Sequence, residues 1–260
     1  MRIFQVDSFT DQVFRGNPAA VCMFVGNESD QWMHDMAGEM NLSETAFLKE
    51  REDGYELRWF TPSDEVDLCG HATLAAAHVL WESGEVAAAQ DVRFFTRSGI
   101  LRATKTGNWI ELDFPLEEAE PTSPPPELID GLGVPFTYVG LNRMDYIVEV
   151  ESEAILRDLK PRREVLAKLT NRGVMVTCRS ENDAYDFVSR FFAPSIGIDE
   201  DPVTGSAHCC LGPYWKKKMG KDEFTAYQAS QRGGVLKLRV GDRVYIRGQA
   251  KTVFQGNVCL

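Results

Sequence analysis

The first half of the chain alternates hydrophobic and polar residues in short runs that predict strands, with two helical patterns among them. The predicted strands cover residues 2–9, 20–25, 43–49, 55–61, 92–96, 101–105 and 109–114. A first helix is predicted to begin with Asp30 as its N-cap, because apolar residues recur at i, i+3, i+4 and i+7 from Met33 to Met40. Residues 71–81 are apolar on nearly all sides, which is typical of a helix buried in a core, and Gly84 is a suitable stop.

The second half begins after a proline-rich segment. Residues 115–126 hold five of the twelve prolines and few apolar residues, which indicates an interdomain linker. We therefore expect domains at 1–115 and 116–260, with the final residues able to return to the first domain. The elements predicted beyond it are helices at 164–169 and 206–219, strands at 174–178 and 184–192, and a hairpin of 235–240 with 243–247.

The two halves share one local pattern. The string Phe60-Thr61-Pro62-Ser63 precedes Gly70-His71-Ala72 and an apolar helix, and Phe192-Ala193-Pro194-Ser195 precedes Gly205-Ser206-Ala207 and another helix. The spacing between the two copies is about half of the 260-residue chain. This predicts an internal duplication, and an α/β (α+β) fold of two similar domains with one central helix each, near 71–83 and 206–219.

Composition and charge restrict the classes of partner. Apolar residues make up 43% and charged residues 26%, as in globular proteins, and the formal net charge of -11 argues against nucleic-acid binding. The sequence shows no signal-peptide pattern and no apolar run of membrane-spanning length. The six cysteines lack CxxC spacing, which favours reduced thiols. We expect a cytoplasmic protein that binds neither nucleic acid nor membrane.

The glycines at the heads of the two central helices, Gly70 and Gly205, are candidate binding positions. A helix N-terminus carries unpaired N–H groups and partial positive charge, and glycine allows a ligand to approach the backbone. Two such termini facing each other would suit a small carboxylate substrate. The alternative is that each glycine only permits a tight turn.

Three side chains are candidates for proton chemistry or binding. Glu44 is expected in a strand, on one face with Leu42 and Ala46, where burial would raise its pKa above about 4.3 and suit it to general acid–base work. An edge-strand carboxyl pointing at water is the alternative. His71 in the first turn of its helix is a candidate relay or donor, or a structural cap. Asp201 precedes the second helix, where it could bind substrate or only complement the helix dipole.

Other chemistries lack their patterns. Ser206 is not in a G-x-S-x-G elbow, and the sequence has neither a P-loop nor a G-x-G-x-x-G turn. The four histidines lack metal-site spacing, and Cys209-Cys210 adjacency suits buried helix cysteines better than a metal. These patterns therefore give no support for a nucleotide cofactor or a metal site.

Four motifs resemble the PhzF-like family of phenazine-biosynthesis isomerases. They are Gly16-Asn17-Pro18-Ala19-Ala20-Val21, Leu42-Ser43-Glu44-Thr45-Ala46-Phe47, Phe60-Thr61-Pro62 with Gly70-His71-Ala72-Thr73, and Glu200-Asp201-Pro202-Val203-Thr204-Gly205-Ser206-Ala207. The resemblance implies a diaminopimelate-epimerase-like fold, with each domain a curled sheet or barrel around its helix, and a homodimer without metal or cofactor. It further implies that Glu44 is catalytic, that His71, Asp201 and Ser206 line the pocket, and that Gly70 and Gly205 supply backbone donors.

The function favoured by these residues is a cofactor-independent isomerase that moves a proton on a small carboxylate, with Glu44 as the general acid and base. One alternative is a non-catalytic small-acid-binding or interaction protein that retains the pocket. An amino-acid racemase is a further alternative, because a relative of this fold uses one cysteine at the head of each helix. Here Cys69 precedes Gly70, but the second half carries Asp201-Pro202 instead.

Overall fold

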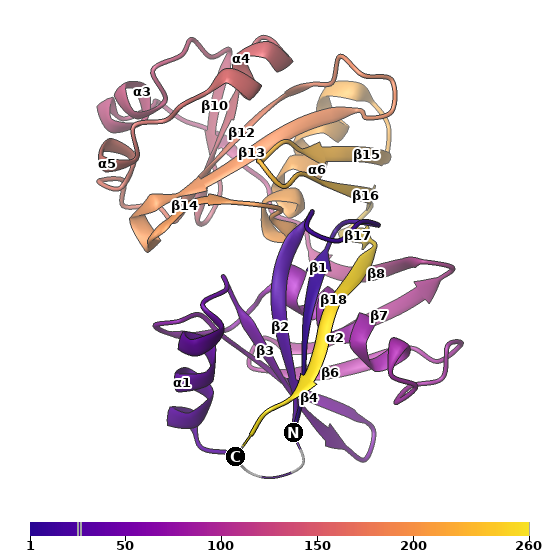
Figure 1. Cartoon of the computed structure of the whole chain (residues 1–260). Helices are drawn as coiled ribbons and strands as arrows, with labels where there is room; N and C mark the ends of the chain where they lie inside the picture. Colours follow the sequence, from indigo (N-terminus) through magenta and orange to yellow (C-terminus); the bar gives the residue numbers. More distant parts are fainter. Residues whose placement is uncertain (25, 27, 260) are drawn as a thin grey trace. The chain divides into compact units, whose positions relative to one another are not determined.

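The computed structural model describes residues 1–24, 26 and 28–259 and shows a mixed α/β fold (Figure 1). The chain divides into two compact units: unit 1 comprises Met1–Asp113 with Arg247–Leu260, and unit 2 comprises Phe114–Ile246. The last strand, β18 (Ala250–Asn257), pairs with β1 (Arg2–Ser8), which places the end of the chain in unit 1. Among the described residues, no helix has both the length and the apolar character needed to cross a membrane.

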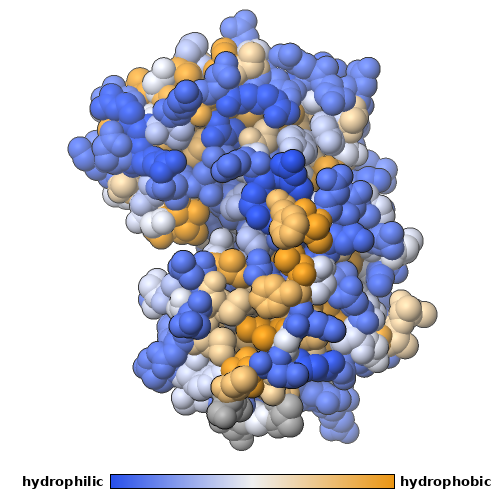
Figure 2. All heavy atoms as spheres, viewed as in Figure 1, coloured by the Kyte–Doolittle hydropathy of each residue, from blue (hydrophilic) through white to orange (hydrophobic). Residues whose placement is uncertain are grey.

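Unit 1 is built from strands around helix α2 (Gly70–Glu82). Its other elements are β2 (Asn17–Met23), α1 (Asp30–Met40), β3 (Thr45–Arg51), β4 (Gly54–Phe60), β5 (Glu65–Val66), β6 (Val92–Thr96), β7 (Gly99–Thr106) and β8 (Trp109–Pro115). Helix α2 packs on β1, β2, β3 and β18 (Figure 1), and nearly all of its residues are buried, as the apolar pattern predicts. Figure 2 shows hydrophobic side chains gathered over unit 1, where β1, β2 and β18 lie.

Unit 2 is built around helix α6 (Gly205–Met219), which packs on β16 (Gly234–Val240). Its other strands are β9 (Glu120–Pro121), β10 (Tyr138–Leu141), β11 (Asp145–Glu149), β12 (Gly173–Arg179), β13 (Phe187–Ala193), β14 (Ile198–Asp201), β15 (Glu223–Gln228) and β17 (Arg243–Gly248). Its short helices are α3 (Pro126–Leu132), α4 (Glu153–Asp158), α5 (Arg163–Leu166) and the 3₁₀ turn η1 (Pro194–Ile196).

The strand pairing repeats from one unit to the other. In unit 1, β1 pairs antiparallel with β2, β2 parallel with β3, β3 antiparallel with β4, and β4 parallel with β6. In unit 2, β10 pairs antiparallel with β11, β11 parallel with β12, β12 antiparallel with β13, and β13 parallel with β15. Each parallel crossover from β4 and from β13 contains the central helix. The predicted duplication is therefore present in the topology.

Helix α6 contains Pro213, which lacks the N–H that would bond the carbonyl of Cys209. The N–H of Glu117 donates to that carbonyl at 3.1 Å, so the buried acceptor is satisfied by another segment. The helix ends at Gly220, whose φ of +66° is the left-handed value that glycine adopts without strain. Lys216, Lys217 and Lys218 lie in its last turn, where cations suit the helix dipole.

Several local predictions need correction. The N-cap of α1 is Ser29, not Asp30, because the extended Ser29 backbone lets its hydroxyl accept from the N–H of Trp32. Helix α5 ends at Leu166, before the predicted 169. The predicted linker contains β9, which pairs with β10. The strand predicted at 20–25 is β2, and residue 25 lies outside the described residues.

Candidate active site

The first functional cluster lies at the N-terminus of α2 and consists of Glu44, His71 and Cys69. Strands β2 and β3 run parallel, with Ala20 opposite Thr45. The residues just before Ala20 and Thr45 therefore lie at the same end of the two strands. Nε2 of His71 is 3.3 Å from Oε2 of Glu44. On the other side of the ring, Nδ1 of His71 is 3.2 Å from Nδ2 of Asn17 and 3.5 Å from Sγ of Cys69.

His71 is a neutral imidazole with an assigned tautomer. Only 5% of the residue is exposed, and burial lowers its pKa from 6.5 to about 3. The amide N–H of Asn17 donates to Nδ1, so Nδ1 carries the lone pair and the proton is on Nε2. Nε2 makes no hydrogen bond to the Glu44 carboxylate, although it lies 3.3 Å from Oε2. The backbone carbonyl of His71 accepts from the hydroxyl of Ser8 at 2.8 Å, which fixes the first turn of α2 against β1.

The prediction that Glu44 lies within a strand is wrong, because β3 begins at Thr45 and Leu42 lies outside it. The backbone of Glu44 still joins the sheet edge, since its carbonyl accepts from the N–H of Ala20 at 3.3 Å. Its side chain is 15% exposed and faces His71, which differs from a carboxyl pointing into water. The predicted rise in its pKa stays a prediction.

Cys69 is the N-cap of α2 and makes no hydrogen bond from its side chain to the first turn. The cap therefore leaves the early N–H groups of the helix to other acceptors. Gly70 and His71 are the first two residues of this helix, as the sequence predicts.

The second functional cluster lies at the N-terminus of α6 in unit 2. Asp201 is buried, and its Oδ2 accepts from Oγ1 of Thr204 at 2.5 Å. Gln228 joins the two residues: its Nε2 donates to the carbonyl of Asp201 at 2.8 Å, and its Oε1 accepts from the N–H of Thr204 at 2.8 Å. Thr204 is the N-cap of α6 but makes no capping bond with its side chain. Gly205 and Ser206 follow as the first helical residues.

Sequence reasoning missed a cation in this cluster. Nη2 of Arg172 donates to Oγ of Ser206 at 3.1 Å, and Nε donates to Oδ1 of Asp145 at 2.9 Å while Nη2 also bonds Oδ2. Burial opposes the charge of Arg172, but the hydrogen bond and charge of Asp145 outweigh it and raise the pKa of Arg172. Asp145 opens β11 and Arg172 directly precedes β12, its parallel neighbour. The pairing of β11 with β12 brings Asp145 and Arg172 together, and no local sequence motif indicates this pairing.

Three other polar residues of α6 are structural. His208 is fully buried, burial lowers its pKa to about 4, and its Nδ1–H donates to the carbonyl of Thr204 at 2.8 Å. Burial raises the pKa of the Cys210 thiol to about 12 and also raises that of Cys209. Neutral thiols of this kind are inert, in agreement with the sequence interpretation.

The side chains of Glu44, Cys69 and His71 are of types that bind zinc, and one donor atom of each lies within 4.8 Å of the others. The thiol and the carboxylate, however, contact different nitrogens of the ring. One ion would reach a single ring nitrogen, so side chains would have to move to complete a site. The observed arrangement is a thiol and a carboxylate on opposite sides of one ring.

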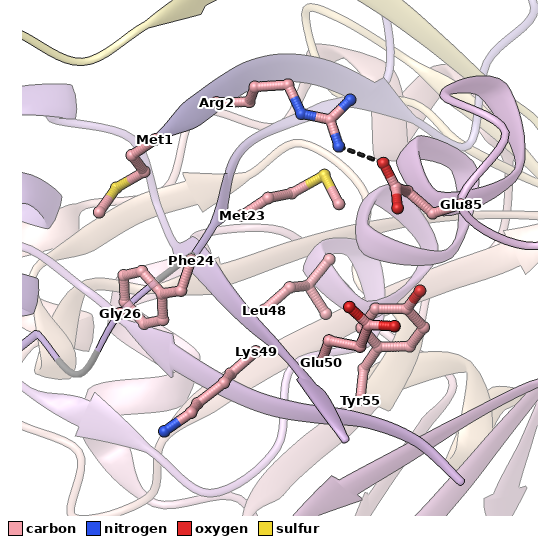
Figure 3. Close-up of a pocket in the computed structure, with 10 residues that line it drawn as sticks. All are labelled: Met1, Arg2, Met23, Phe24, Gly26, Leu48, Lys49, Glu50, Tyr55 and Glu85. Atoms are coloured by element: carbon pink, nitrogen blue, oxygen red, sulfur yellow. Dashed lines mark hydrogen bonds and ion pairs between the residues drawn. The ribbon is translucent and has the colours of Figure 1, made fainter. Parts of the chain in front are cut away.

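A cavity of about 460 Å³ lies elsewhere in unit 1 (Figure 3). It is lined by Met1, Arg2, Met23, Phe24, Gly26, Leu48, Lys49, Glu50, Tyr55 and Glu85, and an ion pair joins Arg2 to Glu85. None of the predicted site residues lines this cavity. Each unit therefore has its own cluster at a helix N-terminus: Glu44, Gly70 and His71 lie together in unit 1, and Asp201, Gly205 and Ser206 lie together in unit 2.

Known proteins share both the sequence and the fold of this chain. The family described as phenazine biosynthesis-like protein, PhzC-PhzF, matches residues 6–256. An uncharacterized isomerase of Halalkalibacterium halodurans is 56% identical over 260 residues, covering 99% of this chain and 98% of that protein. A PhzF-family protein of Enterococcus faecalis has a solved structure that is 41% identical with a TM-score of 0.95, covering 100% of this chain and 99% of that one.

A probable proline racemase of Agrobacterium radiobacter shares the fold at 12% identity, with a TM-score of 0.63 over 100% of this chain and 93% of that one. The predicted diaminopimelate-epimerase-like fold agrees with this likeness. Matches along almost the whole chain, to proteins named as isomerases and as phenazine biosynthesis-like, also support an isomerase-like enzyme. The chain belongs to the PhzC-PhzF family of phenazine biosynthesis-like proteins.

Proposed function

We propose that this protein is a cofactor-independent isomerase that moves a proton between two carbons of a small carboxylate substrate, with Glu44 as the general base. The observation that carries the proposal is the carboxylate of Glu44 at 3.3 Å from Nε2 of a neutral, buried His71. This contact places a partly exposed carboxylate beside the head of a helix. The isomerase names of similar proteins support the same reaction class.

The proposed reaction needs a C–H bond made acidic by conjugation. Glu44 removes that proton, and negative charge spreads over the conjugated system and its carboxylate. The N-terminal N–H groups of α2, next to Gly70, stabilise this charge because they are fixed donors at the positive end of a helix. Nε2 of the neutral His71 ring lies beside the Glu44 carboxylate, 3.3 Å from Oε2.

We propose that the α6 cluster also binds a small carboxylate ligand. Ser206 offers a hydroxyl beside the guanidinium of Arg172, and Gly205 allows close approach to the backbone. Asp201 accepts from Thr204 and shapes the turn that leads into α6. These contacts suit a ligand with both a carboxylate and a hydrogen-bonding group. We further propose that the protein works as a cytoplasmic homodimer.

A non-catalytic small-acid binder is the main rival, and it would use the same contacts. A racemase with two thiols is disfavoured, because the second unit has Asp201-Pro202 where the first has Cys69-Gly70.

A thermal-shift screen of cyclic amino and hydroxy acids, followed by mass spectrometry of every stabilising compound, separates these functions. Ligand at about 100 times its Kd stabilises the folded protein by about 2.7 kcal/mol, which is readily detected. We expect at least one stabilising acid to be converted to a product of unchanged mass with a different retention time. If every acid that stabilises the protein remains chemically unchanged, the result would favour a non-catalytic small-acid-binding protein.

A further inference from the structure

The guanidinium of Arg172 contacts the hydroxyl of Ser206 at the head of α6, where Nη2 donates to Oγ at 3.1 Å. A guanidinium has only donors, whereas a hydroxyl has one donor and two acceptor lone pairs. The bond therefore occupies a lone pair of Ser206 and leaves its O–H proton for a different acceptor. Among the residues that the structure describes, none accepts that proton. The Ser206 hydroxyl can therefore donate to a ligand.

The side chain of Arg172 is held in place from several sides. Nε donates to Oδ1 of the buried Asp145 at 2.9 Å, and Nη2 bonds Oδ2 of the same carboxylate. The guanidinium carbon lies 5.4 Å from the centre of the Phe191 ring. The backbone carbonyl of Arg172 accepts from the hydroxyl of Ser195 at 2.8 Å. The N–H that reaches Ser206 is therefore fixed before any ligand binds.

We propose that Arg172 is a positioning residue that presents the Ser206 hydroxyl as a donor to the ligand carboxylate, so that the α6 cluster selects ionised acids over the matching amides. This inference rests on the proposed function, because it takes the α6 cluster as a binding site for a small carboxylate. It adds the residue that decides which charge the bound group carries.

The charge of Arg172 acts in the same direction. Two buried carboxylates, Asp145 and Asp201, act on the guanidinium and favour its charged form. In the absence of that cation, both carboxylates would oppose a ligand carboxylate at Ser206. Arg172 offsets this repulsion at hydrogen-bond distance from the hydroxyl, and the partial positive charge of the helix N-terminus adds to the effect. An ammonium group at Ser206 would instead lie beside a guanidinium and be repelled.

A carboxylate also matches the donors of this turn better than an amide of the same shape. Thr204 is the N-cap of α6 but makes no side-chain bond to the first turn, which leaves the N–H groups of Gly205 and Ser206 to other acceptors. A carboxylate offers two acceptor oxygens to these N–H groups and to the hydroxyl. One end of an amide is an NH2 donor, which would meet donors, and its carbonyl lacks the charge that strengthens such bonds.

Acetate and acetamide are suitable probes, because they share one shape and differ in charge. Each is titrated into the full-length protein at constant ionic strength, with the ¹⁵N–¹H NMR signals of the Gly205 and Ser206 backbone amides as the readout. In the wild type, we expect acetate to shift both signals to saturation, and acetamide to shift neither over the same concentrations.

Two substitutions and their combination test whether Arg172 acts through Ser206. Arg172→Lys keeps the charge but loses the planar fork that joins Asp145 to Ser206. It should weaken acetate binding by about tenfold, as should Ser206→Ala, because each removes a hydrogen bond that presents or makes the contact. The double variant should bind acetate within about twofold of Ser206→Ala alone.

Arg157→Lys is the matched control, because Arg157 forms its ion pair with Glu153 on α4, and it should bind acetate like the wild type. Wild-type affinity in Arg172→Lys, additive losses in the double variant, or equal binding of acetamide and acetate would overturn the role of Arg172 alone. The acetamide comparison uses only the wild type, so it decides the matter even if a variant does not fold. A wild type in which acetate shifts neither amide would overturn the proposed binding function of the α6 cluster.

Discussion

Replacing Asp145 by Asn tests how the α6 cluster is held together. Asp145 is 1% exposed and receives two hydrogen bonds from Arg172 through Nε and Nη2. The change keeps the volume of the side chain but leaves the guanidinium with a neutral partner. Removing one partner of a buried ion pair costs about 3–5 kcal/mol. Because the side chain of Arg172 is 28% exposed, water recovers part of that loss, and we expect about 2–3 kcal/mol.

Hydrogen exchange read by mass spectrometry gives the opening free energy of unit 2 directly. Peptides from β11 and β12 in the Asp145→Asn variant should exchange faster by roughly 30- to 150-fold, which corresponds to about 2–3 kcal/mol. The matched control is Asp242→Asn in the exposed β16–β17 turn, which should change the opening free energy by less than about 0.5 kcal/mol. Equal effects of the two substitutions would refute the assignment of Arg172 as a cation fixed by Asp145.

Three further predictions concern the core, the pH dependence and ligand binding. His71 is neutral when folded, with a pKa of about 3, but protonates near 6.5 when unfolded, so acid favours unfolding. Lowering the pH from about 6.5 to 5 should therefore cost the wild type about 1.6 kcal/mol more than His71→Asn in urea titrations. A Cβ at Gly248 would lie 2.5 Å from Phe9, so Gly248→Ala should destabilise by about 1–3 kcal/mol in thermal unfolding, whereas Gly241→Ala, with open space, should not. Ser206→Ala should weaken binding of a stabilising acid by about tenfold, one lost hydrogen bond to the ligand, and should lower the melting temperature of the free protein only slightly, because Arg172 keeps its bonds to Asp145.

The central helices could be predicted from the sequence because their signals are local. An apolar pattern on all sides predicts burial of α2, and glycines after α2 and α6 mark both ends. The repeated strings around Gly70 and Gly205 also predict the duplicated topology, because each string occupies the same place in its unit.

Features that depend on strand register could not be predicted. The parallel pairing of β3 with β2 begins at Thr45 of β3. This pairing decides that Glu44 lies before β3 and not inside it. Arg172 reaches Ser206 only because β11 and β12 are neighbours. Conversely, Cys69 and His71 are two residues apart, but the thiol reaches the ring because Cys69 is the extended N-cap, a conformation that the sequence does not specify.

The measurement that tests the central claim most directly is deuterium incorporation into a converted acid in D2O, compared between wild type and Glu44→Gln. Glu50→Gln is the matched control, because Glu50 lies at the exposed end of β3. The account predicts incorporation by the wild type and by Glu50→Gln, and a loss of at least about 100-fold in Glu44→Gln. Equal incorporation by all three proteins would contradict the assignment of Glu44 as the base.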